Sequence, residues 1–309
     1  MQTEHTIIVR DRAQTPRLSV LTPFYRYDPS AMLKRFGAAP AGVEFILLDD
    51  GSASASLVAN VVSAAQGTSA PARIIVSGDN LGRARARNRL IAEAKGDYVL
   101  FLDADMLPDT SAFLSIWLGI IKTQAPQAAF GGLSLAHAPR SSETALHHAL
   151  FGNSDCRPAR QRARRAAQST ASSNLLVERA FLHAHPFDDH FTGWGFEDVD
   201  WALDASRDTE IMHVDNPATH AGLDDVVTLM RKSAEAGPNF ARLARKHPLQ
   251  VRQFAAHRIA RALRATPARK AQQHLYSWIA RDPRGLAPMR VRCAAFKLLR
   301  ASHFAEHLA

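Results

Sequence analysis

Short apolar runs alternate with longer amphipathic segments over the first part of the chain. A short apolar run bounded by Gly, Pro or Asp predicts a buried strand, and an apolar stripe with helical spacing predicts a helix. The predicted strands are residues 17–22, 43–48, 73–76 and 98–102, and the predicted helices are residues 56–65, 81–94 and 111–121. This alternation predicts an α/β fold with a Rossmann-like, mostly parallel sheet flanked by helices. Ligands of such sheets bind beyond the carboxyl ends of the strands.

The rest of the chain has a different pattern. Residues 229–309 are mainly helical in character and form a predicted basic C-terminal extension. We therefore divide the chain into an N-terminal extension (1–16), an α/β domain (17–228) and this helical region. The arginine-rich run at 157–165 predicts a mobile loop.

Positive charge is concentrated near the C-terminus. The chain has 38 Lys and Arg against 29 Asp and Glu, and residues 242–309 contain 15 of the former and 2 of the latter. The remainder, with 23 basic and 27 acidic residues, is slightly acidic. Such a block predicts an anionic partner, a membrane leaflet in preference to nucleic acid, because few aromatic residues interleave with the arginines. A solvated helical appendage is the alternative.

Composition excludes several classes of protein. Two cysteines, Cys156 and Cys293, cannot build a disulfide framework or a four-cysteine zinc site. No apolar run approaches the roughly 20 residues that span a bilayer. Residues 1–16 are polar and lack the apolar core of a secretory signal. The sequence therefore predicts a cytoplasmic protein, with peripheral attachment to the inner face of the membrane through residues 241–309.

Two aspartates, Asp103 and Asp105, follow the last predicted strand. If the strand continued, alternation would send both carboxylates to one face. Neighbouring carboxylates repel each other unless a cation lies between them, and oxygen ligands suit Mn²⁺ or Mg²⁺. A metal site is therefore predicted here, with two solvated acids at a strand end as the alternative.

Other polar groups follow the neighbouring strands. Asp49 and Asp50 end the second predicted strand, where an acid can accept hydrogen bonds from a base or a ribose, or can cap a helix. The third predicted strand is followed by a helix start, where backbone N–H groups and arginines favour anions. The residues singled out in that segment are Asn80, Gly82, Arg87 and Asn88.

The segment Gly193-Trp194-Gly195-Phe196-Glu197-Asp198 combines an aromatic pair with two glycines and two acids. Flat apolar rings suit the C–H faces of sugars, and a carboxylate can remove a proton from a hydroxyl group. A Trp-anchored turn before a helix is the alternative. Farther along, His220 is a candidate third metal ligand, and His213 competes for that role.

Taken together, these motifs resemble the family 2 glycosyltransferases, which have the GT-A fold. The resemblance extends from about Leu18 to Leu223, and its elements occur in the family's order. They are SVLTPFYR, LLDDGS, DNLGRARARN, GDYVLFLDADM, ASSNLLVER, GWGFEDVDW and the late histidine.

The resemblance implies a role for each matching residue. Asp198 would be the catalytic base, and Glu197 would hold the acceptor together with Trp194 and Gly195. The metal ligands would be Asp103, Asp105 and His220. The nucleotide-sugar pocket would include Thr22, Pro23, Asp49, Asp50, Asn80, Gly82, Arg87, Asn88 and Asp103.

The resemblance further implies an inverting, metal-dependent transfer from a nucleotide-diphosphate sugar to a hydroxyl of a glycan or lipid-linked saccharide. The Gly-Trp-Gly-x-Glu-Asp form is similar to that of enzymes using UDP-galactose or UDP-N-acetylgalactosamine. No Gln-x-x-Arg-Trp motif follows, which argues against a processive synthase. The competing hypothesis is a non-catalytic, polyanion- or membrane-binding protein on the same fold. A nucleotidyltransferase is disfavoured because Thr22 and Pro23 stand where its Gly-rich, Lys-containing signature would be.

Overall fold

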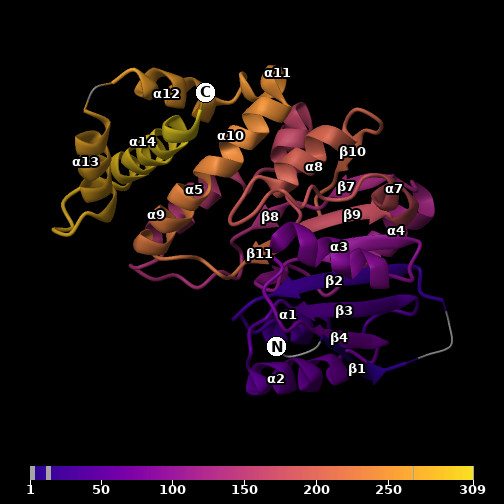
Figure 1. Ribbon diagram of the computed structural model, residues 1–309. Coiled ribbons are helices and arrows are strands. Elements are labelled where there is room, and N and C mark those ends of the chain that lie inside the picture. Colours follow the sequence, from indigo (N-terminus) through magenta and orange to yellow (C-terminus); the bar gives the residue numbers. More distant parts are fainter. Residues whose placement is uncertain (1–3, 12–14, 267, 309) are drawn as a thin grey trace. The chain divides into compact units, whose positions relative to one another are not determined.

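The computed structural model describes residues 4–11, 15–266 and 268–308 (Figure 1). Within them, the main sheet has eight strands in the order β1-β4-β3-β2-β5-β9-β7-β10. Strands β2 to β5 run parallel, whereas β1 and β9 are antiparallel to their neighbours. The predicted mostly parallel α/β sheet is confirmed. The bounds are β1 His5–Arg10, β2 Leu18–Phe24, β3 Val43–Asp49, β4 Ala72–Val76, β5 Tyr98–Leu102, β7 Ala128–Phe130, β9 Asn174–Glu178 and β10 Ile211–His213.

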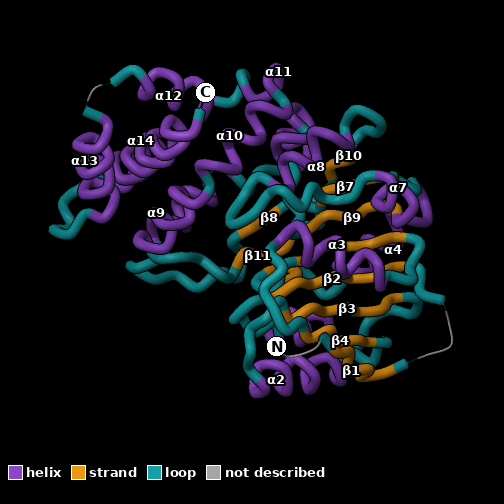
Figure 2. Tube along the Cα trace, viewed as in Figure 1, coloured by secondary structure: helices purple, strands orange, loops and turns teal. Residues whose placement is uncertain are grey.

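Helices alternate with these strands (Figure 2). Strands β2 to β5 are almost wholly buried, as expected for a sheet covered by helices on both faces. The apolar stripe of α4, which includes Phe113, Trp117 and Ile121, is buried. The helices of this part are α1 Ser30–Phe36, α2 Ala55–Gly67, α3 Arg83–Glu93, α4 Phe113–Thr123 and α7 Arg179–Ala184.

A second, three-stranded sheet consists of β6 (Met106–Pro108), β11 (Ala218–His220) and β8 (Leu133–Ser134). Strand β11 is antiparallel to β6, with His220 opposite Met106. This pairing brings a late segment of the chain beside the residues that follow β5.

The N-terminal residues contribute an edge strand to the main sheet. Strand β1 pairs antiparallel with β4, from His5 opposite Val76 to Arg10 opposite Ala72. The predicted N-terminal extension therefore includes a sheet element, while residues 1–3 and 12–14 lie outside the described residues.

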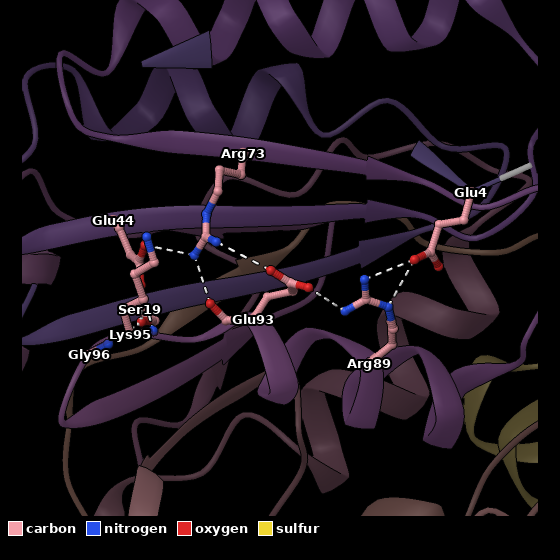
Figure 3. A network of polar contacts seen from close by, with 8 residues as sticks. All are labelled: Glu4, Ser19, Glu44, Arg73, Arg89, Glu93, Lys95 and Gly96. Carbon is pink, nitrogen blue, oxygen red and sulfur yellow. Dashed lines mark hydrogen bonds and ion pairs between the residues drawn. The ribbon is translucent and has the colours of Figure 1, made fainter. Parts of the chain in front are cut away.

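The amino ends of the parallel strands are joined by a polar network (Figure 3). The Ser19 hydroxyl donates to Glu44, and Arg73 donates to both Glu44 and Glu93. Arg89 extends the network from Glu93 to Glu4. The Ser19, Glu44 and Arg73 side chains are thus paired at the amino ends of the strands, whereas Glu4 precedes His5, which lies opposite Val76 at the carboxyl end of β4.

The chain divides into two compact units. The first, which holds both sheets, comprises Met1–Ala138, Asp155–Asp189 and Trp201–Gly222. The second comprises Pro139–Ser154, His190–Asp200 and Leu223–Ala309. Segment His190–Asp200, with the predicted catalytic acids, thus groups with the helical C-terminal region, a division that differs from the predicted boundary at residue 228.

The second unit is helical. Its core includes Leu146, Leu229, Phe296 and Leu299. The helices are α5 Ala145–Ser154, α9 Val226–Glu235, α10 Gly237–Lys246, α11 Pro248–Val251, α12 Ala255–Arg264, α13 Arg269–Arg281 and α14 Met289–His307. Helix α8, Glu197–Ala205, begins in the second unit.

Candidate active site

The loop after β3 is fastened to the loop before α3 through Asp50. Its carboxylate accepts the backbone N–H groups of Leu81 and Gly82 at 2.7 and 3.1 Å. The Asn80 amide donates to the Asp50 carbonyl at 3.0 Å. Burial raises the pKa of Asp50 and the nearby Asp49 adds to this, while the two backbone hydrogen bonds oppose it. Asp50 and Asn80 therefore shape this edge of the sheet together.

Asp49 is fully buried beneath the same loops. One oxygen accepts the Ser52 N–H at 2.9 Å, and the other has no hydrogen-bond partner among the described residues. The adjoining Gly51 has φ +80°, and a Cβ there would lie 2.7 Å from the Asn80 nitrogen. Only glycine suits both this left-handed backbone and this close approach.

Helix α3 starts at the carboxyl edge with a glycine and an exposed arginine. Gly82 precedes the helix with φ +81°, and a Cβ there would meet nothing within 4 Å. Arg83, the first helical residue, is exposed and lowers the pKa of Asp105 by its charge. The amino end of α3 thus combines the positive end of the helix dipole with a cation, an arrangement that favours phosphate groups.

Arg87 lies one turn farther into α3 and is only 1% exposed. Its Nη2 donates to Asp103 Oδ1 at 3.0 Å, and its guanidinium lies 5.7 Å from the centre of the Phe187 ring. The next residue, Asn88, exchanges two hydrogen bonds with the backbone of Phe187. Both side chains therefore hold neighbouring parts of the protein in place, and Arg87 fixes the position of Asp103.

Asp103 and Asp105 do not lie on a continued strand, so the expectation that alternation aligns their carboxylates is wrong. Strand β5 ends at Leu102, and the Met106 N–H donates to the Asp103 carbonyl at 3.0 Å to close a turn. The two carboxylates have different partners: Arg87 for Asp103 and a histidine for Asp105. Strand β6 of the three-stranded sheet begins immediately after this turn.

Asp105 is paired with His220. The His220 Nε2 donates to Asp105 Oδ2 at 3.0 Å, and the Ala221 N–H donates to the Asp105 carbonyl at 2.9 Å. Burial tends to raise the pKa of Asp105, but the hydrogen bond and charge of His220, with the charge of Arg83, lower it overall. The pairing of β11 with β6 is what brings His220 to this place.

Gly222 completes the contact with Asp105. A Cβ at Gly222 would lie 2.4 Å from Asp105 Oδ2 and 2.8 Å from Asp105 Cβ. No side chain larger than hydrogen fits there unless the carboxylate moves. Gly222 was not singled out from the sequence, although a glycine two residues after a candidate metal ligand can indicate a close approach of the backbone to the site.

The side chains of this corner suit a divalent cation. Asp105 supplies a carboxylate oxygen and His220 an imidazole nitrogen, both acceptable to Mn²⁺. In the described part of the chain, Asp103, Asp105 and His220 do not bring their ligand atoms within 4.8 Å of one another as a trio. Two protein ligands are enough for a cation that also binds phosphate oxygens of a substrate.

His213, the competing histidine, lies elsewhere. It ends β10, where Arg162 donates to its Nδ1 at 3.3 Å and its Nε2 donates to the Ala166 carbonyl at 3.2 Å. Burial and the neighbouring Arg162 lower the pKa of His213 to about 4. Its ring is therefore neutral at physiological pH and serves packing near Phe130.

The basic run at 157–165 is ordered, so the predicted mobile loop is wrong. It forms the short helix α6 (Ala159–Arg162) followed by a 3₁₀ turn, Ala163–Arg165. Arg162 is buried, donates to the carbonyls of Arg157 and Val214, and lies 5.3 Å from the centre of the Phe130 ring. Gly132 makes room for it, because a Cβ there would contact the guanidinium.

The residues at the end of β2 contribute an aromatic rim and a buried hydroxyl. Thr22 is buried, and its hydroxyl lies 3.8 Å from the Met32 sulfur, while Pro23 is half-buried. Tyr25 and Tyr27 are 43% and 41% exposed. Burial and the charges of Asp105 and Asp28 raise the pKa of Tyr27. Tyr27 was not singled out from the sequence.

The remaining predicted residues lie in the second unit, in the loop before α8. Gly193, Gly195 and Phe196 have φ of 75°, 87° and 72°. Phe196 accepts this uncommon conformation because its ring packs 5.2 Å from that of Phe240 and 5.6 Å from that of Phe304. The loop is therefore held in one shape by the C-terminal helices.

Asn239 fixes the backbone of the same loop. Its buried amide nitrogen lies 2.9 Å from the carbonyls of Thr192 and Gly195, and 3.4 Å from that of Trp194. Asn239 was not noticed in the sequence, because a single asparagine in a helical stretch gives no signal there.

The acids that follow open helix α8. Glu197 is buried, and Asp198 is half-buried and accepts the Val199 N–H at 2.8 Å. Acids at a helix amino end are stabilised by the helix dipole. Asp200 is buried one turn on and is bound by Lys246 and His247. Asp198 thus stands on a helix end that is rigidly anchored.

The fold and a match to a family of known proteins both indicate the class of this protein. The architecture is the GT-A glycosyltransferase fold, and residues 19–138 match the family described as Glycosyl transferase family 2. The matched region contains the loops of Asp50 and Asp103 and ends four residues after β8. These matches support the predicted class, a glycosyltransferase.

The chain is also similar to individual glycosyltransferases. The chain is 45% identical over 62 residues to the amylovoran biosynthesis glycosyltransferase AmsB of Erwinia amylovora, which is 20% of this chain and 21% of that protein's length. Mannosyltransferase PcManGT from Pyrobaculum calidifontis, solved with GDP-Man and Mn²⁺, has a TM-score of 0.57 and 16% identity over 94% of this chain and 86% of its own. Glucosyl-3-phosphoglycerate synthase from Mycobacterium tuberculosis was solved with Mn²⁺, UDP and glucosyl-3-phosphoglycerate. The comparison with it has a TM-score of 0.50 and 18% identity, and it covers 75% of this chain and 80% of the synthase.

Proposed function

We propose that the protein is a metal-dependent, inverting glycosyltransferase. It transfers a sugar from a nucleotide-diphosphate donor to a hydroxyl group of a glycan or lipid-linked saccharide. The observation that carries this proposal is the meeting of Asp105 and His220, 3.0 Å apart, at the carboxyl edge of a GT-A sheet. A carboxylate and an imidazole held together beside a phosphate-binding helix end are suited to a metal and a diphosphate.

The donor occupies the loops at this edge in the proposal. Asp50 and Asn80 shape the nucleoside pocket, and the amino end of α3 with Arg83 faces the diphosphate. Arg83 suits this role better than Arg87, because Arg87 is buried against Asp103. Mn²⁺ or Mg²⁺, when bound by Asp105 and His220, supplies positive charge that stabilises the departing diphosphate.

Asp198 is the general base of the proposed reaction. It takes the proton from the acceptor hydroxyl, whose oxygen attacks the anomeric carbon from the face opposite the leaving diphosphate and so inverts that centre. The rigid loop around Trp194 offers an apolar face to the acceptor sugar. Glu197, which precedes Asp198 and is buried, holds the acceptor in the same proposal.

The neighbours' ligands narrow the donor class. PcManGT was solved with GDP-Man, and the synthase from M. tuberculosis was solved with UDP, so a nucleoside diphosphate fits this fold. A UDP-galactose or UDP-N-acetylgalactosamine donor rests on the Gly193–Asp198 segment alone. The acceptor hypothesis includes a lipid-linked saccharide on the cytoplasmic side of a membrane.

The test is hydrolysis and binding of UDP-, GDP- and dTDP-sugars with Mn²⁺. We expect the wild type to hydrolyse one donor slowly, and Asp105→Ala to lose Mn²⁺-dependent binding at least about tenfold. Asp97→Asn, an exposed acid at the other edge of the sheet, is the matched control. With an acceptor, Asp198→Asn should reduce transfer at least about a hundredfold and leave donor binding nearly unchanged. No donor binding by the wild type, with or without metal, contradicts the proposal.

A further inference from the structure

Four large apolar side chains are exposed within one hairpin of the helical unit. Leu275 and Trp278 on α13 are each 53% exposed, Leu286 in the following loop is 79% exposed, and Val291 at the start of α14 is 46% exposed. Helices α13 and α14 pack side by side through a short loop (Figure 1). We refer to residues 269–297 as the basic hairpin.

These apolar side chains do not serve the fold of the unit. The inward face of α13 carries Tyr276, Ile279 and Ala280, which pack in the helical core. Leu275 and Trp278, three residues apart, share the opposite face of the same helix. Exposed large apolar side chains that the core does not need are typical of an interaction site.

The hairpin that carries these apolar side chains is strongly basic. Residues 269–297 contain seven Lys and Arg and one acid, Asp282. Asp282 is occupied in shaping the loop, because its Oδ1 accepts the N–H groups of Leu286 and Ala287. The exposed basic residues around the apolar group are Lys270, Arg281, Arg284, Arg290 and Lys297.

The combination of apolar and basic groups selects one partner chemistry. Leucine and tryptophan side chains lose water contact when they enter the headgroup and acyl boundary of a bilayer, and Trp is favoured at that boundary. Lys and Arg are attracted to anionic headgroups. Pairing with a second copy of the chain would bring two strongly basic surfaces together, and their charges would repel each other. A nucleic acid would attract the basic residues but would not bury the exposed leucines.

We propose that the basic hairpin is a docking surface for an anionic lipid leaflet. The apolar residues insert at the headgroup level while the surrounding Lys and Arg contact anionic lipids. No helix among the described residues is long and apolar enough to cross a membrane, so attachment by this hairpin is peripheral. This docking surface would bring the enzyme to a lipid-linked acceptor, and in that respect the inference rests on the proposed function.

The experiment uses the full chain with two kinds of vesicle, phosphatidylcholine alone and an equimolar mixture with phosphatidylglycerol. Co-sedimentation should require phosphatidylglycerol. Trp194 is half-buried in the same unit as Trp278, so the fluorescence experiment uses the Trp194→Phe variant, whose other tryptophans, Trp117 and Trp201, are buried in the other unit. Brominated phosphatidylcholine in the mixed vesicles should quench the tryptophan fluorescence of this variant, and addition of Trp278→Phe should abolish that quenching. Quenching that persists in Trp278→Phe overturns the assignment of this residue to the membrane surface.

Two double variants separate insertion from charge attraction. Leu275→Ser with Trp278→Ser, and Arg284→Glu with Arg290→Glu, should each weaken partitioning into mixed vesicles at least about tenfold. The matched controls are Leu249→Ser, at a leucine 70% exposed outside the hairpin, and Arg252→Glu. Controls should bind within about twofold of wild type.

Other outcomes overturn the proposal. Hairpin variants that sediment like wild type refute the surface, and equal binding to phosphatidylcholine alone refutes the requirement for anionic lipid. A wild-type dimer in light scattering that dissociates in the Leu275/Trp278 variant assigns the surface to a second copy instead. Vesicle binding needs no sugar transfer, so it is measured equally well in Asp198→Asn, and the two proposals can fail separately.

Discussion

The imidazole of His247 lies 2.8 Å from the carboxylate of Asp200, and both side chains are buried. The other carboxylate oxygen accepts a hydrogen bond from Lys246 at 2.7 Å. This pair joins the end of α10 to the first turn of α8, two residues after Asp198. The helical C-terminal region therefore builds the loop of the proposed base and is more than an appendage.

Removal of His247 should destabilise the protein. In His247→Ala the buried Asp200 loses the hydrogen-bond partner of its Oδ1, and removal of one partner of a buried carboxylate costs about 3 kcal/mol. Urea unfolding at neutral pH measures the change in the free energy of unfolding. Arg231→Ala, which breaks an exposed pair with Glu235, is the control and should change it by less than about 0.5 kcal/mol. If the two substitutions change the free energy of unfolding equally, the buried pair contributes no more to stability than the exposed pair.

Asn239→Ala should reduce turnover more than it weakens donor binding. The substitution leaves the carbonyls of Thr192 and Gly195 without their donor, and unpaired buried groups cost about 1–3 kcal/mol. The loop that carries Trp194 and precedes Asp198 then loses its fixed shape. Steady-state kinetics with a donor and an acceptor should show a fall in kcat with a small change in the donor KM.

Asn153 provides the control for Asn239. It is exposed in α5 of the same unit, and its amide donates to the Ala149 carbonyl within the helix. Asn153→Ala should leave both kinetic parameters near wild type. Partial unfolding would lower the apparent kcat at unchanged KM, so kcat is divided by the folded fraction measured by circular dichroism under the assay conditions. A corrected kcat equal to that of wild type refutes a positioning role for Asn239.

Much of the first unit could be predicted from local pattern. The apolar runs of β2 to β5 are almost wholly buried, and such runs read as strands because both faces of a covered parallel sheet exclude water. The loops after these strands meet because parallel strands end at one edge. Asp50 and Asp103 were therefore predicted to lie at a common edge without any knowledge of their contacts.

Long-range pairing could not be predicted in the same way. The turn at Asp103–Asp105 depends on β6, a three-residue strand too short to give an apolar signal. Burial of Arg162 depends on the missing side chain of Gly132 and on carbonyls from a distant segment. A local pattern predicts that an arginine inside a basic run is exposed, because the residues that would bury and pair with it are distant in sequence.

Gly222→Ala should weaken metal binding without unfolding the protein. The new Cβ would lie 2.4 Å from Asp105 Oδ2, so the carboxylate must move away from His220. We expect Mn²⁺ affinity, measured from the electron paramagnetic resonance signal of free Mn²⁺, to fall about tenfold or more. Gly119→Ala in α4, where a Cβ meets nothing within 4 Å, should leave the affinity unchanged and stabilise the helix by about 0.5–1 kcal/mol. Unchanged Mn²⁺ affinity in Gly222→Ala would place the metal away from Asp105.

Stability should fall as the pH decreases from about 6.5 to about 4, and His213 should contribute to that fall. Burial and Arg162 lower the pKa of His213 to about 4 from the value of 6.5 for a free histidine. Between these two values the unfolded chain binds a proton that the folded protein does not, so protonation favours unfolding. The folded arrangement also requires a neutral ring, since Nδ1 accepts from Arg162.

His213→Gln removes this titration and should flatten the dependence of the free energy of unfolding on pH. Because the ring is only partly buried, solvent screening reduces the expected difference between pH 4 and pH 6.5 to about 1–2 kcal/mol. Burial also lowers the pKa of His257 and His303, so part of the wild-type slope should remain in the variant. Urea unfolding at a series of pH values compares the two slopes directly. Parallel curves for wild type and variant would show that His213 has the same proton affinity in the folded and unfolded states, and its packing against Arg162 would then have no electrostatic consequence.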